Sequence, residues 1–287
     1  EPSSLLRQPC PLLTEPCRSC IRASTNKAQM FKLFKELYDY RELTQYLVVL
    51  NLKTRYRGSI LGFLWTLLNP LLLMLVMWVV FSRVARVEED NYALFLLSGL
   101  IVWLFFSQSI EAGLNSIIKQ RSLMQKIYVP KVVFPVAVVT SNLVNLLFAL
   151  VAYIIVALLS TGGLPSTIFL LVPALLMLYL VALGSALLLA TLNVFFRDFT
   201  HLTSAVLRAL FYLTPVIYPP DLFGEQAAMY LKLNPVYYPV ITARDVLYYG
   251  KIPTADVWLI GFASSLLILV IGATVFMKNQ KKFVFYA

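Results

Sequence analysis

The stretch LKTRYRGSILGFLW, at residues 52–65, decides how this chain folds, because a basic segment passes directly into an apolar one. Lys53, Arg55 and Arg57 are three cations within five residues, and no charged residue follows at positions 60–81. An uncharged run of about 20 residues has the length of a helix that crosses a bilayer. Because short segments rich in Lys and Arg stay in the cytoplasm, the end of this span near Arg57 is predicted to be cytoplasmic.

The composition predicts an all-α membrane protein with several spans. Of the 287 residues, 60% are apolar and 13% are charged, and the mean hydropathy is +0.78. The net charge of +10 raises the question of nucleic acid as a partner. The cations cluster at the ends of apolar runs, where anionic lipid head groups and cytoplasmic orientation explain them. We therefore expect contacts with membrane lipids and exclude nucleic acid.

Six apolar stretches are predicted to span the membrane, with both termini in the cytoplasm. With this topology, 18 of the 24 Lys and Arg residues lie on the inner side and 5 on the outer side, and Arg208 falls within the fifth span. This distribution satisfies the positive-inside rule. Residues 57–287 are therefore predicted to form one transmembrane domain. Its predicted spans are residues 60–81, 93–112, 132–159, 168–194, 202–218 and 258–277.

Three features inside these spans predict local structure. Pro70 is expected to bend the first span, since proline removes one backbone hydrogen bond. Gly58 and Gly62 form a Gly-x-x-x-Gly motif at the start of that span, which predicts a close approach of two helices. Asn142 and Asn145 are three residues apart and share one helix face, which is expected to pack against other spans.

Two segments precede the first span. Residues 1–29 contain four prolines and all three cysteines, and they are predicted to be an extension or leader that is partly disordered. The three cysteines alone provide too few ligands for a zinc site, because the only histidine, His201, lies far away. Residues 30–56 are predicted to form an amphipathic helix on the cytoplasmic membrane surface. A soluble helix that packs on another domain is the alternative.

The inner segment 115–131 combines cations with apolar side chains and contains no acid. A loop that merely obeys the positive-inside rule explains the charge but not the apolar residues. A short amphipathic helix that docks in the groove of a partner explains both. The candidate docking residues are Lys119, Arg121, Leu123, Met124, Lys126, Ile127 and Tyr128.

The outer segment 221–250 is too polar to span the membrane and too aromatic for a free loop. Two short re-entrant helices that dip into the outer leaflet fit this composition. A cap on the outer surface is the alternative.

The motifs of an enzyme are absent from the sequence. No Gly-x-x-x-x-Gly-Lys-Ser/Thr loop appears, so no phosphate-binding loop is expected in this chain. We predict no catalytic residue, no metal site and no cofactor here. A membrane-embedded enzyme that processes glycans would need outward-facing acids in a catalytic arrangement, and the acids on that side are scattered. They are Asp221, Glu225, Asp245 and Asp256.

Five segments, in order, resemble permease subunits of ABC transporters that export lipid-linked polysaccharides. The resemblance covers residues 30–287 and is specific in this combination. The segments are LKTRYRGSILGFLWTLLNP (52–70), LSGLIVWLFF (97–106), LMQKIYVPK (123–131), FRDF (196–199) and YLTPVIYP (212–219).

The resemblance implies an assembly and a role for each unusual segment. It implies a homodimer that binds two copies of a separate ATPase, which holds ATP and Mg²⁺. The segment 119–131 would be the coupling helix on that ATPase, residues 30–54 the interface helix, and the short helices in 221–250 periplasmic gate helices. Arg55 and Arg57 would receive the diphosphate of the lipid carrier, since guanidinium groups bind phosphate oxygens in a fixed geometry.

The resemblance also implies a wide channel for the glycan between the two protomers. Aromatic rings suit such a channel, because sugar rings slide over them without being held tightly. The alternative is an aromatic belt at the membrane interface. The candidates are Phe211, Tyr212, Tyr218, Tyr237 and Tyr238.

The predicted function is ATP-driven export of an undecaprenyl-diphosphate-linked polysaccharide across the inner membrane. O-antigen is the expected substrate. Teichoic acid and capsular polysaccharide remain open, because exporters of all three share these motifs. An ABC exporter of the same fold with a smaller substrate is a further alternative.

Overall fold

The structure is a computed structural model, and it describes residues 36–84, 91–126, 129–220 and 229–283. The extension predicted at residues 1–29 lies outside the described residues, as do Ile127 and Tyr128. All regular secondary structure in the described ranges is helical. The predicted all-α class is therefore confirmed.

Five of the six predicted spans are found as helices that are long and apolar enough to cross a membrane. The sixth, at 202–218, corresponds to α9 (Phe199–Leu213), which has 15 residues. At 1.5 Å per residue this helix is about 22 Å long, shorter than a hydrocarbon core of about 30 Å. The count of six therefore stays a prediction. The five are α3 (Trp65–Val84), α4 (Tyr92–Leu114), α7 (Val133–Thr161), α8 (Leu171–Phe195) and α12 (Ala255–Asn279), with single 3₁₀ turns η1 (Gly62–Leu64) and η2 (Ser166–Leu170) before α3 and α8.

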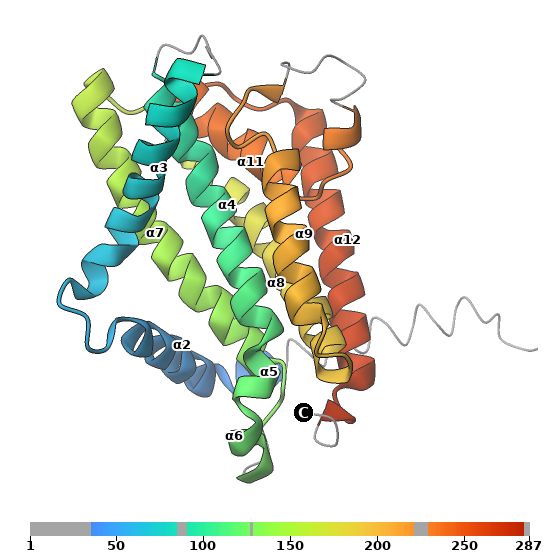
Figure 1. Cartoon of the computed structure of the whole chain (residues 1–287). Coiled ribbons are helices and arrows are strands. Elements are labelled where there is room, and N and C mark those ends of the chain that lie inside the picture. Colours follow the sequence, from blue (N-terminus) through green and yellow to red (C-terminus); the bar gives the residue numbers. More distant parts are fainter. Residues whose placement is uncertain (1–35, 85–90, 127–128, 221–228, 284–287) are drawn as a thin grey trace, which may run out of the picture.

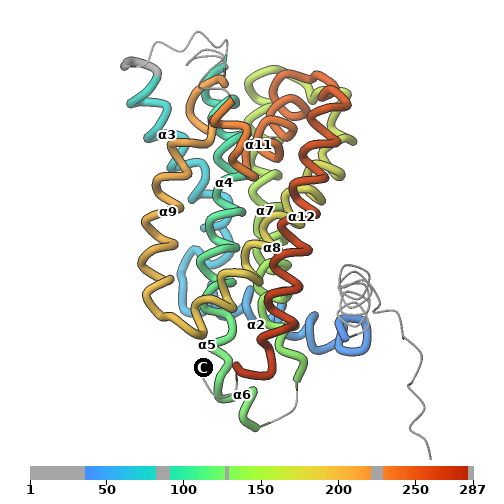
Figure 2. The backbone as a smooth tube through the Cα atoms, turned by 90° about the vertical axis from the view of Figure 1, so that its right-hand side faces the viewer, coloured from blue at the N-terminus to red at the C-terminus, as the bar shows by residue number. Residues whose placement is uncertain are grey.

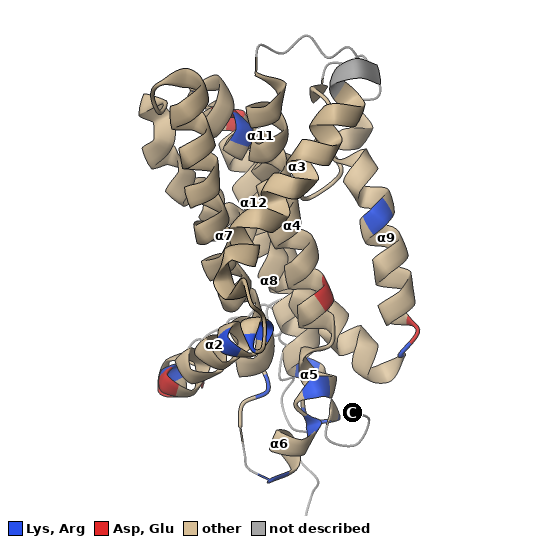
Figure 3. Cartoon of the chain, turned by 60° about the vertical axis from the view of Figure 1, so that its left-hand side comes forward, with Lys and Arg blue, Asp and Glu red and all other residues tan. Residues whose placement is uncertain are grey.

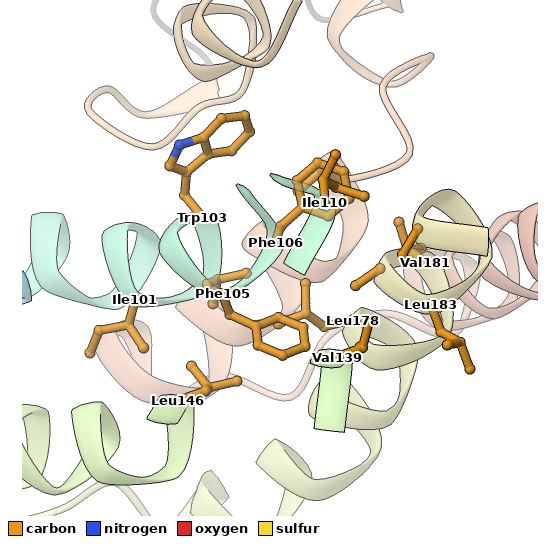
Figure 4. Packing of buried hydrophobic residues seen from close by; sticks show 14 of the residues in the cluster. Ile101, Trp103, Phe105, Phe106, Ile110, Val139, Leu146, Leu178, Val181 and Leu183 are labelled. Atoms are coloured by element: carbon orange, nitrogen blue, oxygen red, sulfur yellow. The ribbon is translucent and has the colours of Figure 1, made fainter. Parts of the chain in front are cut away.

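Helix α4 is the centre of the bundle, and it packs against α3, α7, α8 and α11 (Tyr237–Arg244). Figure 4 shows side chains of α4, among them Phe105, meeting Leu146 of α7 and Leu178 of α8. In the most apolar stretch of α4, 78% of the residues are buried, against 6% for the first span. The apolar surface of α3 is thus left for lipid or for another chain.

Helices α8 and α12 cross at two glycines. A Cβ on Gly184 would lie 2.6 Å from the backbone of Leu269, and a Cβ on Gly272 would overlap the carbonyl oxygen of Gly184. Only glycine allows two helix backbones to approach this closely. This crossing fixes the position of the last span.

The close helix approach predicted at Gly58 and Gly62 is wrong. Arg57 ends α2 (Arg41–Tyr56) with extended backbone, and both glycines follow it with positive φ, 78° and 46°. A Cβ built on either glycine would have no atom within 4 Å. The motif packs helices only when both glycines are helical. Here they turn the chain from α2 into α3.

The two ends of the bundle differ in charge. Helix α2 lies across one end, and the short helices α5 (Ser116–Lys119) and α6 (Arg121–Lys126) project from the same end (Figures 1 and 2). Lys and Arg gather on these three helices (Figure 3), and we call this the basic end. Helix α11 and the π-turn η4 (Asp245–Tyr249) lie at the opposite end. That the basic end and both termini face the cytoplasm stays a prediction.

Candidate functional site

A cavity of about 640 Å³ opens at the basic end between α2, α3, α4 and α7. Its wall is unusually polar for a bundle of apolar helices. Polar side chains inside a membrane domain are costly unless they have a function or a partner. The polar lining residues are Arg55, Tyr56, Ser59, Thr66, Asn69, Gln108, Glu111, Asn115, Lys119, Asn142 and Asn145.

Arg55 joins three helices at this cavity. Its Nη2 donates to Oδ1 of Asn142 on α7 at 2.8 Å, and its Nη1 to Oε1 of Gln108 on α4 at 3.4 Å. Asn142 is buried and also donates to Oγ of Ser109 at 3.4 Å. A hydrogen bond with one charged partner is about twice as strong as a neutral one. The last turn of α2 is therefore anchored through the guanidinium of Arg55.

Tyr56, the residue after Arg55, also forms a hydrogen bond with α7. The hydroxyl of Tyr56 donates to Oδ1 of Asn145 at 3.2 Å. Burial raises the pKa of Tyr56, and the neighbouring charge of Arg55 opposes that rise. The hydroxyl therefore keeps its proton at neutral pH. The prediction that Asn142 and Asn145 pack against other helices is confirmed.

A second cavity, of about 290 Å³, lies next to the first, and Arg55 and Lys119 line both. It extends from α2 past α5 to the first turns of α7. Arg57, the other predicted phosphate ligand, is exposed at the end of α2 and lines neither cavity. The structure thus brings Arg55, and not Arg57, to this site.

The predicted coupling residues form two groups. In α6, Arg121 and Lys126 are exposed, while Leu123 and Met124 are half-buried against the core. Lys131, the last residue of the predicted coupling segment, lies beyond the end of α6, and burial lowers its pKa. Ile127 and Tyr128 lie outside the described residues. Attachment of an ATPase to this segment stays a prediction.

The aromatic candidates are divided between two surroundings. Phe211 packs against Trp103, and Tyr212 next to it is 67% exposed. The hydroxyl of Tyr218 donates a hydrogen bond to the carbonyl of Tyr212 at 2.8 Å. The rings of Tyr237 and Tyr238 are buried and meet edge to face, 5.3 Å apart. Whether any of them lines a channel stays a prediction.

The burial of Arg244, one of the five cations predicted on the outer side, was not expected from the sequence. This side chain of α11 is 1% exposed. It donates to the carbonyls of Pro215 at 2.6 Å and Val216 at 2.8 Å, and its guanidinium lies 3.9 Å from the ring centre of Phe95. No pattern in the sequence distinguishes Arg244 from an exposed cation.

Comparisons with known proteins identify the family. The chain matches the family model described as ABC-2 type transporter over residues 42–248. It is 35% identical to the O-antigen export system permease protein RfbA of Myxococcus xanthus, over 88% of this chain and 98% of that protein. A protein of the same name from Klebsiella pneumoniae is 30% identical, over 87% and 97%. The polysialic acid transport protein KpsM of Escherichia coli is 23% identical, over 70% and 80%. The chain therefore belongs to the ABC-2 type transporter family and is a membrane permease, not an enzyme.

Proposed function

We propose that this chain is the channel-forming permease subunit of an exporter that moves undecaprenyl-diphosphate-linked polysaccharide, O-antigen first, across the inner membrane. The relatives that carry the O-antigen name are 29–35% identical to this chain. Those named for polysialic acid or capsule are 23–25% identical. This difference favours O-antigen over capsular polysaccharide as the substrate. No observation favours teichoic acid.

The observation that carries the proposal is the guanidinium of Arg55 in a polar cavity beside the exposed helix α3. The lipid tail of a carrier would stay in the bilayer next to α3, while its diphosphate enters at the basic end. Phosphate oxygens are stronger acceptors for guanidinium than the amide oxygens of Gln108 and Asn142. Binding would therefore exchange these amides for the diphosphate. Arg57, which is exposed at the end of α2, would supply a second cation outside the cavity.

The assembly that we propose is a homodimer with two copies of a separate ATPase, which binds ATP and Mg²⁺. The uncovered apolar surface of α3 supports a contact with a second copy. The projecting helix α6, with exposed cations and two half-buried apolar residues, supports a seat on the ATPase. In this assembly α11 and η4 serve as the gate on the periplasmic side, and both termini lie in the cytoplasm.

Deletion of the gene in its native host tests the function. We expect loss of O-antigen from the cell surface, accumulation of undecaprenyl-linked polymer inside the cell, and rescue of both by the wild-type gene. Loss of capsule with normal O-antigen would assign the chain to the second candidate. Unchanged surface polysaccharides of both classes would contradict the proposal.

A further inference from the structure

We propose that the cavity beside Arg55 is a saccharide subsite, which binds the first sugar of the lipid-linked glycan next to its diphosphate. The inference rests on the proposed function and adds to it a residue-level site for the sugar. It predicts that the permease recognises the carrier by its first sugar as well as by its charge.

The polar wall of the cavity has the chemistry that sugar hydroxyls need. Five amides line it: Asn69, Gln108, Asn115, Asn142 and Asn145. A side-chain amide offers both donors and acceptors, and a sugar hydroxyl uses both. Neighbouring hydroxyls on one ring can therefore pair with amides on two helices. A lipid tail has no group that could form hydrogen bonds with these amides.

Asn145 has unused hydrogen-bonding capacity at this wall. It is 8% exposed, its Oδ1 accepts from Tyr56, and its Nδ2 has no hydrogen-bond partner among the described residues. A buried donor without a partner is destabilising, because it has lost its hydrogen bonds to water. A rotation of the amide, with the hydroxyl of Tyr56 following, would bring Nδ2 to a sugar hydroxyl in the cavity. Binding would then satisfy a donor that the protein leaves unpaired.

Aromatic rings in the same cavity offer surfaces on which the apolar face of a sugar can pack. Tyr56, Trp65 and Phe105 line it together with the amides. The C–H face of a pyranose ring packs on aromatic faces, while its hydroxyls point sideways to polar groups. The volume of about 640 Å³ lies within the usual range for small-molecule sites, about 300–1,000 Å³.

The charges in the cavity assign the two parts of the ligand to different positions. Arg55 and Lys119 attract the diphosphate, whereas the carboxylate of Glu111, one turn beyond Gln108 on α4, repels it. The same carboxylate accepts hydrogen bonds from hydroxyls. The diphosphate is therefore placed at Arg55, and the neutral sugar along Gln108, Glu111 and the α7 amides.

Equilibrium binding tests the subsite. The permease, purified with its ATPase and placed in nanodiscs, is titrated with radiolabelled undecaprenyl diphosphate and with the same carrier bearing one sugar: glucose, galactose or N-acetylglucosamine. We expect at least one sugar-bearing carrier to bind the wild type about tenfold more tightly than the bare carrier, as one or two net hydrogen bonds would give. Asn145→Leu should reduce this difference to about twofold or less, without changing the affinity for the bare carrier.

Further variants separate the possible outcomes. Asn279→Leu, which changes an amide on α12 outside both cavities, should leave every affinity unchanged. Tyr56→Phe removes only one hydroxyl and should also reduce the sugar-dependent difference. Equal affinities for bare and sugar-bearing carriers in the wild type, or a full difference in Asn145→Leu, would overturn the subsite. Arg55→Gln should weaken binding of all carriers alike. If the wild type binds none of them, the proposed function fails as well.

Discussion

Nη2 of Arg244 occupies the space that a side chain on Gly99 would need, since a Cβ on Gly99 would lie 2.6 Å from that atom. The guanidinium lies over the ring of Phe95, one turn earlier on α4, and holds the carbonyls of Pro215 and Val216. Arg244 therefore joins α11, α4 and the irregular segment after α9. Backbone dipoles and an aromatic face stabilise its charge, and the neighbouring Asp245 interacts with it electrostatically.

Replacing Arg244 by Gln is expected to destabilise the protein by about 2 kcal/mol or more, because two buried carbonyls lose their donors. Gly99→Ala should act in the same direction through its overlap with the guanidinium. The midpoint of thermal unfolding in detergent measures both effects. Arg208→Gln, on the exposed face of α9, is the matched control. An unchanged midpoint for Arg244→Gln would contradict this role.

Gly272→Ala should separate α8 from α12, because its Cβ would overlap the carbonyl oxygen of Gly184. We expect a loss of about 1–3 kcal/mol, the usual cost of overpacking. Gly163→Ala is the control, since a Cβ there would have no atom within 4 Å. The unfolding midpoints of the two variants would be compared, and equal values would argue against a tight crossing.

Apolar length predicted the five long helices, because an uncharged run in a bilayer has few alternatives to a helix. The shared face of Asn142 and Asn145 was also predictable from their spacing. Their partners were not, since Arg55 and Tyr56 reach them only through the turn at Gly58 and Gly62.

The close crossing of α8 and α12 and the burial of Arg244 also escaped prediction. Both depend on the relative placement of distant helices, and a single sequence does not record this. The helix spacing of Gly58 and Gly62 suggested a packing motif, but the helix ends before them.

Lys126→Glu is expected to reduce export while ATP hydrolysis and membrane insertion persist, because Lys126 is exposed on the projecting helix α6. Export in cells and ATPase activity of the purified complex are measured side by side. Lys278→Glu reverses an exposed charge near the end of α12, outside α5 and α6, and should leave export unchanged. Normal export in Lys126→Glu would count against the coupling assignment.

The orientation of the chain is testable with single cysteines in a variant that has Ser at positions 10, 17 and 20. Ser122 on α6 and Gly163, between α7 and η2, are both exposed and lie at opposite ends. A membrane-impermeant maleimide added to spheroplasts should label Gly163→Cys but not Ser122→Cys until the membrane is opened. The reverse pattern would invert the topology.

Purification of the tagged chain from native membranes in a mild detergent, with quantitative mass spectrometry of its partners, tests the central claim most directly. We predict recovery of one ATPase with a Walker-type nucleotide site, in equal stoichiometry with the permease. Recovery of the chain alone in several detergents that keep it folded would contradict its role as the permease of an ATP-driven exporter.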